Sequence, residues 1–191
     1  MSLSALLAAT MMSAAVQAAP TETEVHYVDL FERFCLSTGG QAAVAVGRAD
    51  ADGWARAPEL IQPVPTAPVM DARVSVRPLA DGSVRYFSLV TSSSPPGDKE
   101  AHVCVVDGKH AEPMRLDAVL ALVTDAIGIE PIRQPGRFVW VISGQDPFVD
   151  ERDLPASGAD LFAVARTRSI YLIQLAMDGN QPAVFLMRAG P

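Results

Sequence analysis

The stretch RVSVRPLADGSVRYFSLVT, residues 73–91, contains two runs in which apolar and polar side chains largely alternate. The runs flank Asp81-Gly82, and an Asp-Gly pair between alternating runs is the strongest short-range signal for a β-hairpin. If these two residues form the loop, Val76 lies opposite Phe87 and the hairpin has one mainly apolar and one mainly polar face. The residues expected on the buried, apolar face are Val74, Val76, Phe87 and Leu89.

The same register places Arg73 and Arg77 on the polar face, with Ser75 between them. Tyr86 would lie opposite Arg77, close enough for a cation–π contact. One interpretation is an ordinary solvated face whose charges discourage edge-to-edge aggregation. The other is a surface on which Arg73, Arg77 and Tyr86 bind an anionic group or a protein partner.

A second hairpin is predicted at 170–176 and 182–187, across the turn Asp178-Gly179-Asn180. Its strands are apolar on both faces, which is typical of strands near the centre of a sheet. Two more strands are predicted, at 101–106 and 137–143.

Three segments, 22–36, 41–52 and 113–127, have the composition or the apolar spacing of helices. Thr21 and Glu24 have the spacing of a capping box at the start of the first. Strands joined mostly by hairpins, with helices before and between them, indicate an α+β fold. We therefore expect a single globular domain at 19–191, a mostly antiparallel sheet of five or six strands with three helices packed on one face.

The chain begins with an uncharged, apolar segment, residues 1–18, and Val16-Gln17-Ala18 supplies small residues where a signal peptidase would cut. The segment lacks the usual basic n-region. It predicts a cleaved signal peptide and a periplasmic or secreted protein without stable membrane insertion. An uncleaved anchor and a buried helix are the alternatives.

The composition narrows the classes of partner. Of the 191 residues, 49% are hydrophobic, and 15 basic against 22 acidic side chains give a formal charge of −7. Such a chain can form a core, and it repels nucleic acid and anionic lipid unless a local basic patch intervenes. Neither G-x-G-x-x-G nor G-x-x-x-x-G-K-[ST] occurs in the sequence, and no cofactor is expected.

Cys35 and Cys104 are the only cysteines. In an exported chain they predict one structural disulfide, because the oxidising compartment favours the bond. Two buried thiols, if the chain is not exported, and a redox pair are the alternatives. The spacing is not C-x-x-C, which argues against the redox pair.

Phe31-x-x-Phe34-Cys35, Ala49-x-Ala51-Asp52-Gly53-Trp54 and the strand cysteine Cys104 resemble a family of uncharacterised exported bacterial proteins. The resemblance covers about the first half of the mature chain. It implies export and one disulfide, and it carries no activity and no functional residues.

Two groups of residues could bind a metal. In the first group, His102 and Cys104 share a strand face, but a cysteine in a disulfide cannot ligate a metal. The second group lies in an acidic loop that lacks the EF-hand spacing of calcium sites. We therefore predict no metal site. The first group is His102, Cys104, His110 and Glu112, and the second is Asp146, Asp150, Glu151 and Asp153.

Ser143 follows a strand, but Val141-Ile142-Ser143-Gly144-Gln145 is not G-x-S-x-G. Asp50 and Asp52 stand two residues apart on a helix and point away from each other, which disfavours a shared acid–base role. The expected function is a non-catalytic binding or interaction module. A small hydrolase whose site includes Ser143, His102 or the acidic loop is the alternative.

Overall fold

The computed structural model describes residues 18–60, 69–78, 84–93, 101–154, 163–165 and 167–190. Residues 1–17, which hold nearly all of the predicted signal peptide, and the predicted turn at Asp81-Gly82 lie outside these ranges.

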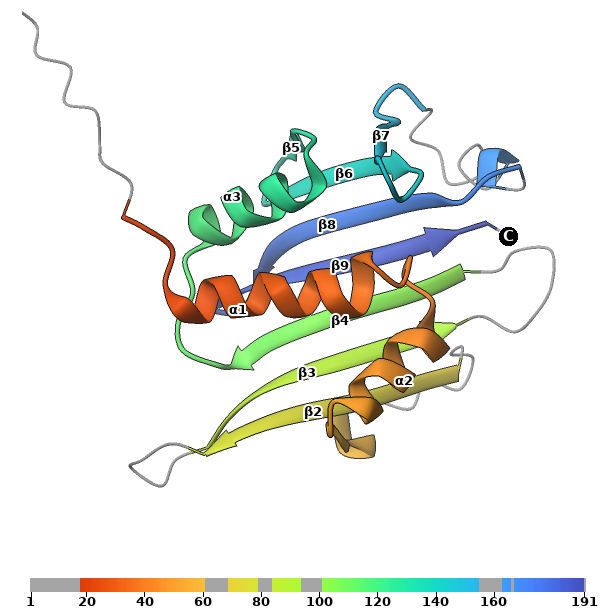
Figure 1. The fold of residues 1–191 in the computed structure, drawn as a ribbon. Helices are drawn as coiled ribbons and strands as arrows, with labels where there is room; N and C mark the ends of the chain where they lie inside the picture. Colours follow the sequence, from red (N-terminus) through yellow and green to blue (C-terminus); the bar gives the residue numbers. More distant parts are fainter. Residues whose placement is uncertain are drawn as a thin grey trace, which may run out of the picture.

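The fold is one antiparallel sheet with its helices on one face (Figure 1). The strands are β1 (Ala55–Arg56), β2 (Val69–Pro78), β3 (Val84–Ser93), β4 (Ala101–His110), β5 (Ile132–Gln134), β6 (Arg137–Ser143), β7 (Val149–Asp150), β8 (Ile170–Asp178) and β9 (Gln181–Ala189). Their order is β1-β2-β3-β4-β9-β8-β6-β5, and β7 also pairs with β6. The predicted second hairpin, β8 and β9, therefore lies near the centre of the sheet, as expected.

The helices with described bounds are α1 (Glu22–Phe31), α2 (Ala42–Ala51) and α3 (Leu116–Ile127). A π-helix, η1 (Glu32–Leu36), continues α1, and a 3-10 turn, η2 (Pro58–Leu60), precedes β2. In Figure 1, α1 crosses β4 and β9, α2 lies over β2 and β3, and α3 lies on the side of β6 and β8.

The expectation of five or six strands and three helices is wrong: the described residues contain nine strands and four helices, of which the fourth includes residues 163–165. The six long strands were predicted. The additional strands β1, β5 and β7 have two or three residues each, too few to show a period of two. They form because a long neighbouring strand offers backbone partners at the edge of the sheet. The third predicted helix begins at Leu116, so Pro113 precedes it and is not in its first turn.

The predicted capping box is confirmed and fixes the start of α1. The backbone N–H of Glu24 donates to Thr21 Oγ1 at 3.2 Å, and that of Thr21 donates to Glu24 Oε2 at 2.7 Å. One turn later, the Tyr27 hydroxyl donates to the carbonyl of Val106 and accepts from the N–H of Val184, both at 2.9 Å. Val106 and Val184 are paired residues of β4 and β9, so α1 is hydrogen-bonded directly to the middle of the sheet.

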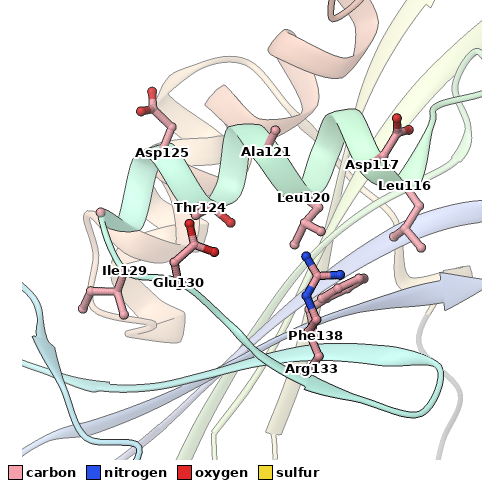
Figure 2. Close-up of a pocket in the computed structure, with 11 residues that line it drawn as sticks. Leu116, Asp117, Leu120, Ala121, Thr124, Asp125, Ile129, Glu130, Arg133 and Phe138 are labelled. Atoms are coloured by element: carbon pink, nitrogen blue, oxygen red, sulfur yellow. The ribbon is translucent and has the colours of Figure 1, made fainter. Parts of the chain in front are cut away.

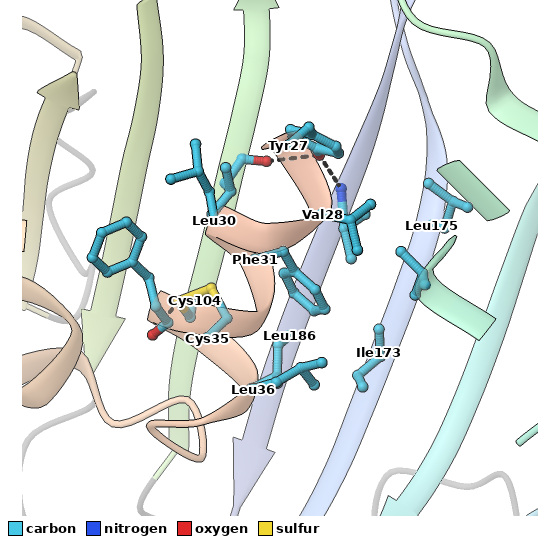
Figure 3. Packing of buried hydrophobic residues seen from close by; sticks show 14 of the residues in the cluster. Tyr27, Val28, Leu30, Phe31, Cys35, Leu36, Cys104, Ile173, Leu175 and Leu186 are labelled. Atoms are coloured by element: carbon cyan, nitrogen blue, oxygen red, sulfur yellow. Dashed lines mark hydrogen bonds between the residues drawn. A yellow bond between two sulfur atoms is a disulfide. The ribbon is translucent and has the colours of Figure 1, made fainter. Parts of the chain in front are cut away.

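The disulfide joins Cys35 in η1 to Cys104 in β4, as predicted. Both cysteines are fully buried. Figure 3 shows the bond beside the apolar side chains of α1 and those of the central strands. The core therefore lies between the helices and one face of the sheet. Representative members are Phe31, Leu36, Ile173, Leu175 and Leu186.

The first hairpin forms, but its register differs from the predicted one by one residue. Val76 pairs with Tyr86 and Ser75 with Phe87, and the pair Pro78 and Val84 leaves 79–83 between the strands rather than a two-residue loop. A slip of one residue exchanges the faces of a strand relative to its partner. Phe87 still packs against the core, whereas Val76 is 55% exposed.

Candidate functional site

The face of the sheet that the helices leave uncovered is the candidate binding surface. Along β8, residues alternate between buried positions under the helices and half-exposed positions on the other side. Leu172 is one of the half-exposed residues, and its neighbours Tyr171 and Ile173 are buried. No described helix or strand lies over this second face. We call it the open face and define it by Val90, Val103, Val105, Leu172, Phe185 and Met187.

The strand register gathers these six residues into two adjacent rows across the sheet. In one row, Val105 pairs with both Val90 and Phe185. In the other, Met187 pairs with both Val103 and Leu172. Cross-strand partners share a face and lie about 4.5–5.5 Å apart, so the two rows together form one mainly apolar surface. It reaches β6 through Val141, the partner of Leu172. Two polar residues lie within it, Gln174 beside Phe185 and Ser92 beside Val103.

The rows differ sharply from a third row beside them. That row carries Ser88, Asp107 and Arg137 among smaller side chains. The centre of the open face is therefore uncharged and mainly apolar, and charged side chains lie at its edge. A shallow hollow of about 200 Å³ lies in the apolar part, and Gln174 is the polar residue that lines it. The Gln174 side chain accepts a hydrogen bond from Arg137 Nη1 at 3.2 Å.

A second concave surface lies between α3 and the β5–β6 hairpin, with a volume of about 900 Å³ (Figure 2). Leu120 and Phe138 contribute apolar walls, and the guanidinium of Arg133 lies 5.4 Å from the centre of the Phe138 ring. Three carboxylates, those of Asp117, Asp125 and Glu130, also line this groove.

The predicted arginine surface is not brought together as expected. Arg73 is only 1% exposed and lies on the helix side of β2, where its guanidinium binds the carboxylates of Asp50 and Asp71. These hydrogen bonds raise the pKa of Arg73, and the bond to Arg73 lowers the pKa of the Asp50 carboxyl. Arg73 is therefore a structural link between α2 and the sheet.

The predicted contact between Arg77 and Tyr86 is also not the observed pairing. Arg77 pairs with Arg85 along the backbone, and its side chain lies outside what the structure describes. Tyr86 instead stacks on the ring of His110, with 4.2 Å between the ring centres. Both differences follow from the one-residue change of register.

The possible metal ligands are used otherwise. Cys104 is in the disulfide, His110 stacks on Tyr86, and the carboxylate of Glu112 accepts a hydrogen bond from Thr23 Oγ1. In the described part of the chain, no three His, Cys, Asp or Glu residues are grouped as metal ligands.

Of the residues of the hydrolase alternative, Ser143 and Glu151 of the acidic loop lie together, and His102 lies apart from them. Ser143 Oγ donates to Glu151 Oε1 at 2.6 Å, and Glu151 in turn binds Arg168 at 2.8 Å. His102 pairs with Arg188 on the helix side of β4, whereas Ser143 lies on the opposite side of β6. The sheet therefore separates the hydroxyl of Ser143 from the imidazole of His102.

The sequence did not predict the open face as a site, although the predicted second hairpin held a signal for it, because both faces of each of its strands are apolar.

Within the described ranges, no helix is both long and apolar enough to cross a membrane. The chain matches no protein-family model, no curated protein and no solved structure.

Proposed function

We propose that this protein is a non-catalytic, exported interaction module that binds a protein partner through the open face of its sheet. The observation that carries the proposal is the apolar character of that face. An antiparallel sheet covered on one side normally alternates between apolar residues inside and polar residues outside. Here the two central rows of the outside face consist of Val, Leu, Phe and Met, except for Gln174 in one row and Ser92 in the other.

Exposure supports the same conclusion. Met187 is 42% exposed, and Val103, Val105, Leu172 and Phe185 are half-buried although no described helix covers them. Single exposed apolar residues are ordinary on protein surfaces, but a contiguous apolar patch with a polar rim is typical of an interaction site. The polar rim is the row that contains Asp107 and Arg137.

Export is part of the proposal and has separate support. The buried disulfide between Cys35 and Cys104 suits an oxidising compartment. The apolar segment at residues 1–18 supplies the predicted signal.

Site-specific photo-crosslinking in the producing cell tests the function. A photoreactive phenylalanine analogue replaces Phe185 on the open face, and in a control it replaces Val44 on α2, which is 41% exposed. We expect one adduct of defined mass from position 185 and none from position 44. Absence of an adduct at 185, or the same adducts from both positions, would contradict the proposal.

A further inference from the structure

We infer that the partner on the open face is a second copy of this chain, packed sheet against sheet in a two-fold symmetric dimer. The inference rests on the proposed function, since it names the protein that the open face binds.

The size of the face fits such a dimer. It is formed mainly by six long strands, β2, β3, β4, β9, β8 and β6, of seven to ten residues each. With about 4.8 Å between strands and about 3.3 Å per residue, this whole side of the sheet, with its polar row included, measures roughly 29 by 30 Å, a planar area of about 870 Å². A stable protein–protein interface needs about 800 Å² from each partner.

The arrangement of side chains also fits an interface between copies. Stable interfaces have an apolar centre with few charges and a polar rim. The rows through Phe185 and Met187 would form that centre, and the row with Asp107 and Arg137 would lie at the rim. In a two-fold dimer the same patch faces itself, so each apolar row meets an apolar surface.

Geometry favours a copy of the sheet over other occupants. Two sheets pack face to face, about 10 Å apart and near −30°, when their twists match, and two copies of one sheet have the same twist. The hollow beside Phe185, at about 200 Å³, is smaller than the roughly 300 Å³ at which small-molecule pockets begin.

Light scattering on the purified protein tests the inference, using a face variant and a matched control. The variant Val105→Thr/Phe185→Thr places hydroxyls at two paired positions of the open face, and threonine, being β-branched, suits a strand. The control Val25→Thr/Val44→Thr changes two exposed valines on α1 and α2. We expect twice the mass of one chain for the wild type and the control at micromolar concentration, and the mass of one chain for the face variant. Circular dichroism checks that all three proteins are folded.

A wild type with the mass of one chain, or a folded face variant that remains dimeric, would overturn the inference. If the face variant unfolds, the adduct formed through position 185 decides, because the dimer requires that adduct to have twice the mass of the chain. An adduct with a different protein would retain the proposed function and overturn the dimer. No adduct from position 185 would overturn both.

Discussion

Arg73 on β2 donates two hydrogen bonds to the carboxylate of Asp50 on α2, from Nε to Oδ1 at 2.5 Å and from Nη2 to Oδ2 at 3.2 Å. Its Nη1 also donates to Asp71 and, at 3.0 Å, to the carbonyl of Ala72. The guanidinium is 1% exposed, whereas both carboxylates are 46% exposed. A buried cation is thus held by two anions that remain in contact with water, and it attaches α2 to the outer strands of the sheet.

Replacing Arg73 with Ala is expected to lower the free energy of unfolding by about 2–4 kcal/mol. The change removes several charge-assisted hydrogen bonds and the packing of a buried side chain. Val76→Asp, three positions along the same strand, is the comparison, because Val76 is 55% exposed and should cost no more than about 1 kcal/mol. Urea denaturation measures both. The hairpin register inferred from sequence gives the opposite ranking, so a larger loss for Val76→Asp would contradict the structure.

The surroundings of Arg73 show which features of the first hairpin the sequence predicts and which it does not. The alternation in 73–91 correctly predicted two paired strands, and Phe87 was correctly placed towards the core. The face of β2 was wrong because the predicted two-residue loop set a register one residue away from the observed one. The ion pair between Arg73 and Asp50 was out of reach, because it depends on how α2 packs on β2.

The open face illustrates a different limit. Apolar residues on both faces of 170–176 and 182–187 correctly predicted central strands. A period of two distinguishes the two faces of a strand, but when both are apolar it does not say which one the helices cover. That depends on the packing of α1, where Tyr27 bonds to β4 and β9. The surface with Phe185 and Met187 could therefore be identified only once the helices were placed.

Loss of the disulfide should destabilise the protein by about 2–5 kcal/mol, because the bond between Cys35 and Cys104 closes a separation of 69 residues. The double variant Cys35→Ala/Cys104→Ala tests this by urea denaturation. Reductant should lower the stability of the wild type towards that of the variant and leave the variant unchanged. Non-reducing peptide mapping should recover the cross-linked pair, and free thiols in the native protein would refute the bond.

Removing the hydroxyl of Tyr27 should cost about 2–3 kcal/mol. Tyr27→Phe leaves the buried carbonyl of Val106 and the N–H of Val184 without their shared partner. Tyr86→Phe is the control, since Tyr86 is half-exposed and contacts His110 through its ring, and it should change stability by no more than about 0.5 kcal/mol. Chemical denaturation of both variants measures the difference. If Tyr27→Phe were as stable as Tyr86→Phe, the Tyr27 hydroxyl would not stabilise the fold, and Val106 and Val184 would satisfy their backbone groups by hydrogen-bonding to each other.

Replacing a glycine with alanine should have opposite effects on stability at Gly40, just before α2, and at Gly47, inside α2. Gly40 has a φ of +69°, and a Cβ there would lie 2.3 Å from Cδ2 of the buried Leu186, so Gly40→Ala should cost about 2–4 kcal/mol. Gly47 lies inside α2 with open space around its Cα. Gly47→Ala should therefore stabilise the protein by about 0.5–1 kcal/mol. Thermal melts rank the two variants, and a stabilising Gly40→Ala would contradict the close approach of this turn to β9.

Stability at low pH should depend on the ion pair between Glu24 and Arg115, which joins the start of α1 to the start of α3. Glu24 is fully buried and its Oε2 accepts from Arg115 Nη2 at 2.9 Å. The hydrogen bonds from the Arg115 side chain, opposed by burial, lower the pKa of Glu24 from its ordinary value of 4.5 to about 2. A carboxyl whose pKa is lower in the folded state stabilises the fold above its unfolded pKa and loses that contribution as the pH falls towards its folded pKa.

The stabilisation should therefore be complete above about pH 4.5 and should disappear between pH 4.5 and pH 2. Its size should be about 1–3 kcal/mol, because the partly exposed Arg115 weakens the pair through solvent screening. The measurement is the difference in unfolding free energy between the wild type and Glu24→Gln, taken by urea denaturation from pH 7 to pH 2. This difference should be largest at pH 7 and shrink towards pH 2, and Arg115→Gln should show the same trend. A difference that does not change with pH would mean that the charge of Glu24 does not contribute and that only its hydrogen bonds stabilise the fold.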